Sequence, residues 1–307
     1  MKWRNFGWLL LLAALWGPSF LFIKVAVHEI PPFTLVWGRV GLAAVVLYGV
    51  MRWQGSTLPA WGKVWQHLTV AALFHNAIPF VLFSWGEQYI DSALAAILNG
   101  TTPVFTILLA HWFVADDRLT LAKVGGAVLG FAGILVLMLP SLQSGVQATT
   151  LGLLAVTVAA ACYGVAIVYA RMHLRGVPPL VASTAQLLVA SVVMAPLSLG
   201  LERPWQLGVP SGAAIGALLS LTFFGTVLAY LIYYHLVTTA DASYLSMVTY
   251  IIPIFGVVLG VSFLGETLNL ATYVGGGFIF LGMMSINGLF QLNWWRRKGA
   301  SVPISGD

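Results

Sequence analysis

The chain has 307 residues, of which 60% are hydrophobic and only 7% are charged, whereas soluble domains carry roughly 25% charged residues. A soluble protein of this length needs a charged surface to stay dispersed, and this chain has too few charged residues to form one. The composition therefore indicates a membrane protein. The net charge of +5 is therefore no argument for a nucleic-acid partner. The single cysteine, Cys162, excludes an internal disulfide, and no group of Cys and His has metal-ligand spacing. We expect neither a metal nor a cofactor.

The N-terminal segment resembles a signal peptide, because basic residues precede an apolar run. The run continues past Pro18 to Val27 without an A-x-A-like cleavage site, so we interpret it as a retained first span. A span needs about 20 apolar residues, and ten segments meet this requirement. They are residues 5–27, 33–51, 66–88, 91–114, 119–139, 150–172, 179–200, 211–236, 241–264 and 269–290.

Lysine and arginine are unevenly divided between the two ends of these spans. Eleven of the fourteen belong to one side, the loops of the other side hold only Arg203, and Lys24 and Arg39 lie inside spans. An excess of positive charge is typical of cytoplasmic loops. We therefore expect a multi-pass protein of the inner (plasma) membrane with both termini in the cytoplasm.

The chain contains an internal repeat. With an offset of 147, "AALWGPSFLFIKVAVHEIPP" aligns with "AAACYGVAIVYARMHLRGVPP", and with an offset of 150 Pro103 matches Pro253. Each half has five spans, an odd number, so the second half enters the membrane in the opposite sense. We predict an all-α polytopic membrane protein of ten transmembrane helices in two inverted five-helix repeats. The repeats are residues 1–140 and 150–290, with a linker at 141–149 and a cytoplasmic tail at 291–307. Inverted repeats are typical of secondary transporters, which bind substrate where the halves meet.

The fourth and ninth spans each place a proline at mid-depth, in "ILNGTTPVF" and in "MVTYIIPIF". A proline removes the hydrogen bond to the carbonyl four residues earlier, which is that of Asn99 for Pro103 and that of Thr249 for Pro253. We predict two equivalent half-broken helices that meet around a central pathway. The alternative is a structural kink in which a neighbouring helix satisfies the carbonyl.

The third span contains "FHNAIPF", which places His75, Asn76 and Pro79 about halfway across the membrane. An ionisable side chain at this depth is a candidate for function, and histidine can take up a proton near neutral pH. A neutral histidine that only packs is the alternative. The acidic residues fall at span ends or in the tail. Transport is then uncoupled, or coupled through His75 or the charge of the substrate.

Two cations, Lys24 and Arg39, lie toward the outer side of spans one and two. They could attract a carboxylate-bearing substrate. We favour a structural interpretation, in which Lys24 reaches the interface and Arg39 pairs with a helix-end carbonyl or with Glu29. Tyrosines are concentrated within the second half, where their rings and hydroxyls would suit an amphipathic metabolite.

Two long segments resemble the EamA-type members of the drug/metabolite transporter superfamily, and more narrowly the YddG-like amino-acid exporters. They are "WGPSFLFIKVAVHEIPPFTLVWGRVGLAA" and "SALAAILNGTTPVFTILLAHWFVADDRLTLAKVGGAVLGFAGILVL", and the resemblance extends over nearly the whole chain. It implies a central cavity and alternating access between the two sides. The candidate lining residues are Trp16, His75, Asn76, Asn99, Thr102, Tyr163, Tyr230 and Tyr250, and the candidate helix breaks for gating are Pro79, Pro103 and Pro253. The halves differ at Arg39, where the repeat places Gln186.

These observations predict a secondary transporter that exports small amphipathic metabolites, above all neutral or aromatic amino acids. Its partners are the small-molecule substrate and the lipid bilayer, with no nucleic acid, and the oligomeric state stays open. Efflux of drugs or other metabolites and a sensor that binds without transport are alternatives. An intramembrane serine protease that uses Gly17-Pro18-Ser19 with His75 is a remote one. We do not expect an enzyme.

Overall fold

The computed structural model describes residues 3–114, 119–143, 147–239 and 247–288, so the expected tail at 291–307 lies outside the described residues. The first half contains α1 (Trp3–Trp16), α2 (Ser19–Ala26), α3 (Pro32–Trp53), α4 (Lys63–Ala72), the π-helix η1 (Leu73–Ala77), α5 (Ile78–Gly86), α6 (Ser92–Asn99), α7 (Thr102–Phe113) and α8 (Leu121–Gln143). The second half contains α9 (Ala148–His173), α10 (Pro179–Leu197), the π-helix η2 (Ser198–Glu202), the short 3₁₀-helix η3 (Pro204–Gln206), α11 (Gly212–Thr222), the π-helix η4 (Phe223–Leu228), α12 (Ala229–Thr239), α14 (Val248–Leu264) and α15 (Leu270–Ile286).

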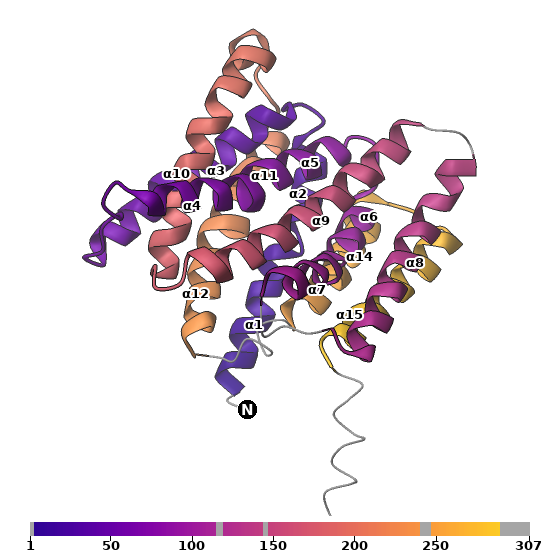
Figure 1. Ribbon diagram of the computed structural model, residues 1–307. Helices are drawn as coiled ribbons and strands as arrows, with labels where there is room; N and C mark the ends of the chain where they lie inside the picture. Colours follow the sequence, from indigo (N-terminus) through magenta and orange to yellow (C-terminus); the bar gives the residue numbers. More distant parts are fainter. Residues whose placement is uncertain (1–2, 115–118, 144–146, 240–246, 289–307) are drawn as a thin grey trace, which may run out of the picture.

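These elements pack side by side in one helical bundle (Figure 1). Within the described residues, eight helical segments are long and apolar enough to cross a membrane, and α14 and α15 are shorter apolar helices. Proline begins two spans, because Pro32 and Pro179 occupy first-turn positions where the missing N–H has no intrahelical partner. Gly265, at φ 66°, ends α14 in the left-handed conformation that glycine adopts without strain. The predicted spans are thus bounded by ordinary helix-end chemistry.

The packing reflects the inverted repeat. Spans two and seven pack together (α3 with α10), as do spans five and ten (α8 with α15) and spans four and nine (α6 with α14). Span three packs on span six through α5 and α9, and its equivalent, span eight, packs on span one through α11 and α2. Each of these contacts between the halves is therefore either its own symmetry mate or is matched by an equivalent contact.

Side-chain contacts repeat in the same way. Gly17 lies against the side chain of Phe255, and its equivalent Gly164 lies against Phe105, so close that a Cβ on Gly164 would stand 3.0 Å from the Phe105 Cβ. Phe105 and Phe255, from the two proline-containing spans, thus fill the space that a side chain at Gly164 or Gly17 would need. Larger residues at either glycine would push the two halves apart.

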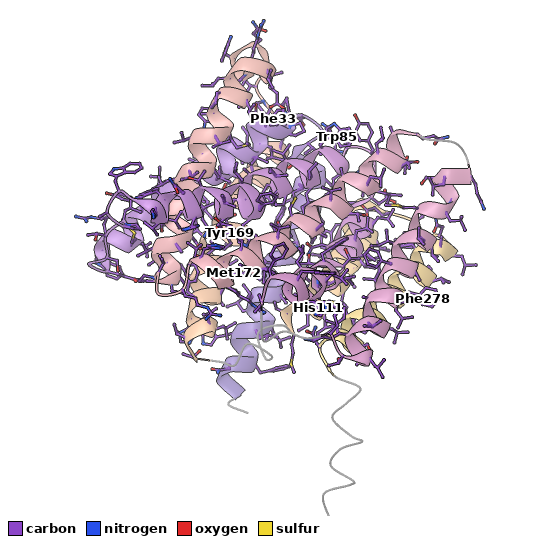
Figure 2. The ribbon with its side chains drawn as sticks, in the orientation of Figure 1. Phe33, Trp85, His111, Tyr169, Met172 and Phe278 are labelled. Atoms are coloured by element: carbon purple, nitrogen blue, oxygen red, sulfur yellow. The ribbon has the colours of Figure 1, made fainter. Side chains whose placement is uncertain are left out.

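The helices end at two opposite faces of the bundle. The carboxylate face is the one where α2, α5, η2 and α14 end, and it carries Glu29, Glu87, Glu202 and Glu266. The terminal face is the opposite one, where the start of α1 lies beside the end of α12 (Figure 1). There the side chain of Asn5 donates to the carbonyl of Thr239 at 3.1 Å. Figure 2 shows Phe33 and Trp85 near the carboxylate face, with His111 farther toward the terminal face.

Candidate functional site

Two pairs of polar side chains join the halves in the interior. Arg39 on α3 donates from Nε to Thr226 Oγ1 at 2.9 Å, and Asn76 donates from Nδ2 to Gln186 Oε1 on α10 at a longer 3.5 Å. The repeat offsets of 147 and 150 make Gln186 the equivalent of Arg39, and Thr226 the equivalent of Asn76. The two contacts are therefore one arrangement, present twice with the halves exchanged. We call these four residues the central polar cluster.

Both π-helices at mid-span carry a member of this cluster. Asn76 lies in η1 and Thr226 in η4, at equivalent positions, and each side chain is 0% exposed. Pro79 follows η1 and has no N–H to return to the carbonyl of His75, so a widened turn accommodates the chain there. π-turns inside helices occur frequently at functional sites. Their placement turns one polar side chain of each half toward the other half.

Arg39 is a buried cation that lacks an acidic partner in the described part of the chain. Its side chain is 6% exposed, and its guanidinium carbon stands 3.9 Å from the centroid of the Phe80 ring. Thr226 accepts its one described hydrogen bond, although the guanidinium has five donors. A desolvated cation over a ring is worth about 2 kcal/mol. The predicted pairing with a helix-end carbonyl or Glu29 was wrong, because Glu29 bonds Ser211 instead.

Aromatic rings surround the cluster. His75 lies edge-on to Tyr163 with ring centroids 5.7 Å apart, and 6.2 Å from Tyr230. The Tyr230 hydroxyl donates to Asn76 Oδ1 at 2.9 Å, which ties the rings to the polar cluster. Trp16 packs on Tyr233 at 5.8 Å. The structure thus brings four predicted residues, His75, Asn76, Tyr163 and Tyr230, into one group from three helical spans.

The proline-containing segment of the fourth span is a broken helix. α6 ends at Asn99 and α7 begins at Thr102, with Gly100 and Thr101 between them. The hydroxyl of Thr102 donates to the Asn99 carbonyl at 2.9 Å, and that of Thr101 donates to the Leu98 carbonyl at 2.6 Å. The Thr102 hydroxyl therefore satisfies the Asn99 carbonyl that Pro103 frees. This carbonyl needs no hydrogen bond from a ligand or from a neighbouring helix.

The equivalent proline of the ninth span, Pro253, lies inside a helix instead of at the start of one. Residues 240–246, where the ninth span begins, lie outside the described residues, so a half-broken ninth span stays a prediction. α14 begins at Val248 and continues through Pro253 to Leu264. The physical reason lies in the residues before each proline. The fourth span has Gly-Thr-Thr, with two hydroxyls to cap a broken end, whereas the ninth has Tyr-Ile-Ile, which favours a continuous apolar helix with a proline inside it.

Tyr250 lies apart from the aromatic group. Its hydroxyl donates to the carbonyl of Met283 at 3.0 Å, and its ring meets Phe280 at 6.0 Å, so the side chain is directed at α15. Among the described contacts none joins Tyr250, Asn99 or Thr102 to His75 or Tyr163. These three predicted lining residues are not part of the group around the central polar cluster.

Three carboxylates on the carboxylate face join one half to a helix start in the other. Glu266 accepts from the backbone N–H groups of Ser92 (2.7 Å) and Ala93 (2.9 Å) at the start of α6. Glu202 accepts from the backbone N–H groups of Phe33 and Thr34 at the start of α3. A carboxylate at a helix N-terminus satisfies unpaired N–H groups and complements the helix dipole.

The third of these contacts joins Glu29 to the start of α11, where the Ser211 hydroxyl and backbone N–H each donate at 2.6 Å. These hydrogen bonds hold the pKa of Glu29 below its ordinary value. We call the contacts of Glu29, Glu202 and Glu266 the carboxylate clamps. Since each crosses between the halves, the clamps hold the halves together on this face.

A pocket of about 330 Å³ lies beside these clamps. Its lining includes Lys24, Asp91 and Glu266, and burial raises the pKa of Asp91. The Lys24 ammonium donates to the main-chain carbonyls of Glu87 and Ile90, both at 2.7 Å. Lys24 therefore caps the end of α5 at this face.

Comparison with known proteins places this arrangement in a family. A model of the EamA-like transporter family matches residues 5–139 and residues 150–288, which together make up most of the chain. The chain belongs to the EamA-like transporter family. The predicted membership of the drug/metabolite transporter superfamily and the predicted fold class are thereby confirmed.

Several named proteins are similar to this EamA-like transporter over most of their length. An "Uncharacterized transporter" of Archaeoglobus fulgidus is 26% identical, over 87% of this chain and 92% of that one. "Protein PagO" of Salmonella typhimurium is 27% identical over 81% and 82%. The "Uncharacterized inner membrane transporter YedA" of Escherichia coli is 24% identical over 92% and 90%. A solved crystal structure, 19% identical, matches with a TM-score of 0.67 over 95% of this chain and 100% of its own, which shows the shared fold.

Proposed function

We propose that this EamA-like transporter is a secondary transporter that exports small amphipathic metabolites, above all neutral or aromatic amino acids. The observation that carries the substrate class is Arg39, a buried cation without an acidic partner in the described residues, beside a group of aromatic rings. Arginine binds a carboxylate through two parallel hydrogen bonds. Rings such as those of Tyr163 and Trp16 can hold the apolar part of the same molecule.

The proposed substrate site is the interior where the two halves meet. Its first members are Arg39, His75, Asn76, Tyr163 and Tyr230, which the described contacts group together. Trp16, Asn99, Thr102 and Tyr250 stay candidates for states in which the halves have moved, with Pro79, Pro103 and Pro253 as candidate pivots. Trp16 and Tyr163 support this view, because each packs against two separate groups of buried apolar side chains, one that includes Leu12 and Ala96 and one that includes Val40 and Leu187.

Alternating access would follow from the carboxylate clamps. All three hold the halves together at one face, so this face is closed to the interior by contacts that a rocking motion can break. We propose that the carboxylate face is the outer one, with the termini in the cytoplasm, because the excess of lysine and arginine belongs to the other side. Release of the clamps would then open the path outward.

Efflux of drugs or other metabolites is the second candidate. An interior cation disfavours cationic drugs, while anionic or neutral compounds with an apolar part would fit the same residues. The remote alternative of an intramembrane serine protease has no geometric support, since the buried Ser19 hydroxyl has no hydrogen-bond partner in the described residues. A serine nucleophile needs a base within hydrogen-bond reach.

The test is uptake into proteoliposomes with a panel of labelled amino acids and with amine analogues that lack the carboxylate. We expect saturable uptake of phenylalanine or tryptophan, and none of phenethylamine. Uptake should fall when Arg39 is replaced by Gln, the residue that the repeat has at position 186. Uptake of the amines but not of the amino acids would contradict the carboxylate assignment and favour the drug-efflux alternative.

A further inference from the structure

Glu87, which directly follows α5, is a buried carboxylate without a hydrogen bond. It is 0% exposed, and neither carboxylate oxygen has a partner among the described residues. Removing an ionised carboxylate from water without a partner is very costly, so such a group takes up a proton instead. In the sequence, Glu87 is one of the acidic residues at span ends, where a side chain is expected to face water.

Charged and titratable groups reach Glu87 from several elements. Lys24 on α2 and Arg39 on α3 favour the ionised form, while Glu266 opposes it. The Lys24 ammonium is bonded to main-chain carbonyls and not to the carboxylate. From α9 and η1 the titratable side chains on this side of α5 are Tyr163, which stacks on Phe83, and His75. Burial outweighs these charges and raises the pKa of Glu87 well above its ordinary value.

Glu87 lies between the pocket on the carboxylate face and the central polar cluster. Lys24 lines the pocket and also binds the main chain of Glu87. On the other side, the charge of Arg39 acts on the same carboxylate. The clamp of Glu266 on Ser92 closes this region. Opening of the clamps would therefore let water from the carboxylate face reach Glu87.

We propose that Glu87 is a proton-binding site filled from the carboxylate face, and that this face closes only over the protonated side chain. In the open state the hydrated carboxylate takes a proton from hydronium, which gives a neutral carboxylic acid and water. Closure then buries a neutral group. The inference rests on the alternating access proposed above, and it adds proton linkage to a chain whose sequence offers no carboxylate at mid-span.

The consequence is an exchange of proton for substrate. After it has released its substrate outward, the transporter can close the carboxylate face only when Glu87 has been protonated. A proton released later toward the terminal face would be moved inward in each cycle. External pH would thus control how much of the protein is closed on the carboxylate face. A one-proton equilibrium of this kind changes by up to about tenfold for each pH unit.

The first experiment measures closure without any substrate. Cys162 is the single cysteine, so a Cys162→Ser background allows Ser92→Cys to serve as reporter. Ser92 is 0% exposed, and its hydroxyl has no partner in the described residues, so the change is small. A membrane-impermeant maleimide is applied from the side of the carboxylate face at several pH values, and the same background with Glu87→Gln is the matched control.

We expect the labelling rate to rise with pH more steeply in the Glu87 background than in Glu87→Gln, which mimics the protonated acid and should stay slow. The comparison removes the intrinsic effect of pH on thiol reactivity. Asp91→Asn, which changes a carboxyl that lines the pocket, should keep the steep dependence. Equal pH profiles of labelling with Glu87 and with Glu87→Gln would overturn the proposal. It would also be overturned if Asp91→Asn abolished the steep pH dependence and Glu87→Gln did not.

Infrared spectroscopy supplies a second readout. The protein at neutral pH should show a carboxylic-acid C=O band that shifts on transfer to deuterium oxide and is missing in Glu87→Gln. An identical band in both proteins would overturn the proposal. If the reporter is never labelled at any pH, alternating access itself fails; labelling that varies with added phenylalanine but not with Glu87 would leave transport intact and remove only the proton site.

Discussion

Arg39 and Gln186 occupy equivalent positions in the two halves, and each bonds the equivalent residue of the opposite half, Thr226 for Arg39 and Asn76 for Gln186. The inverted repeat thus gives a symmetric frame, the four side chains of the central polar cluster, in which Arg39 is the one charged member. A substrate with one carboxylate matches this asymmetry. With Gln at both position 39 and position 186, the same frame could still join the two halves, but it would not select an anionic substrate.

Replacement of Arg39 by Gln should reduce carboxylate transport more than it reduces stability. A hydrogen bond to a charged group is worth about 1.5–3 kcal/mol, which corresponds to a loss of roughly 10- to 100-fold in binding of the carboxylate. Initial rates of phenylalanine uptake into proteoliposomes check this. Arg39→Lys keeps the charge without the planar fork and should lie between the two; unchanged uptake in Arg39→Gln would show that Arg39 only packs.

Loss of one carboxylate clamp should loosen the carboxylate face. In Glu266→Gln the two N–H groups of α6 lose a charged acceptor, and helix-capping contacts are worth about 1 kcal/mol. Labelling of Ser92→Cys should therefore become about fivefold faster, as such an energy changes an equilibrium. Glu29→Gln is the control, because Glu29 holds only Ser211, at an exposed position, and should change labelling less. A larger effect from Glu29 would contradict this ranking.

The Glu29 clamp should survive mild acid. Hydrogen bonds from Ser211 lower the pKa of Glu29 from its ordinary 4.5, so the stabilisation is complete above that ordinary value. It is lost only as the pH falls through the lowered pKa. Thermal unfolding in detergent, compared with Glu29→Gln, should show a difference that persists to pH 4.5 and becomes smaller in stronger acid. A difference that vanishes at neutral pH would exclude this linkage.

The break in the fourth span should depend on one hydroxyl. Thr102→Val keeps the shape but removes the donor to the Asn99 carbonyl, and an unsatisfied buried carbonyl costs about 1–3 kcal/mol. Thermal unfolding in detergent should occur at a lower temperature than in the parent. Thr106→Val is the matched control, because the Thr106 hydroxyl only adds to an intact helix. Equal losses in both variants would argue against a special role for Thr102.

Much of the fold could be read from the sequence, and less of the site. Apolar runs and prolines give the spans, and the repeat offsets already align Arg39 with Gln186. The break at Pro103 but not at Pro253 follows from local residues, since Gly-Thr-Thr caps a break and Tyr-Ile-Ile does not. The depth of a residue within a span does not indicate which way its side chain points, however. Tyr230 and Tyr250 are therefore equal candidates for the site in the sequence, although only Tyr230 reaches Asn76 in the structure.

Burial of Glu87 was beyond prediction for the same reason. Its position after an apolar run is typical of a side chain at the interface, whereas in the structure, where α9, α3 and α2 pack against α5, the side chain is fully buried. The partner of Arg39 was missed because Thr226 lies on the other half, far along the chain. The offset of 150 aligns Asn76 with Thr226, so the repeat itself marks Thr226 as a polar residue of the interior.

The symmetry of the frame can itself be tested by moving the charge. The equivalent of Phe80, whose ring lies under Arg39, is Tyr230, so an arginine at position 186 would meet a similar ring and the amide of Asn76. We expect the double variant Arg39→Gln with Gln186→Arg to recover part of the phenylalanine uptake that Arg39→Gln loses. Gln186→Arg alone should lower uptake, because two like charges would then share a buried region. A double variant no better than Arg39→Gln would mean that only the first half can present the cation to a substrate.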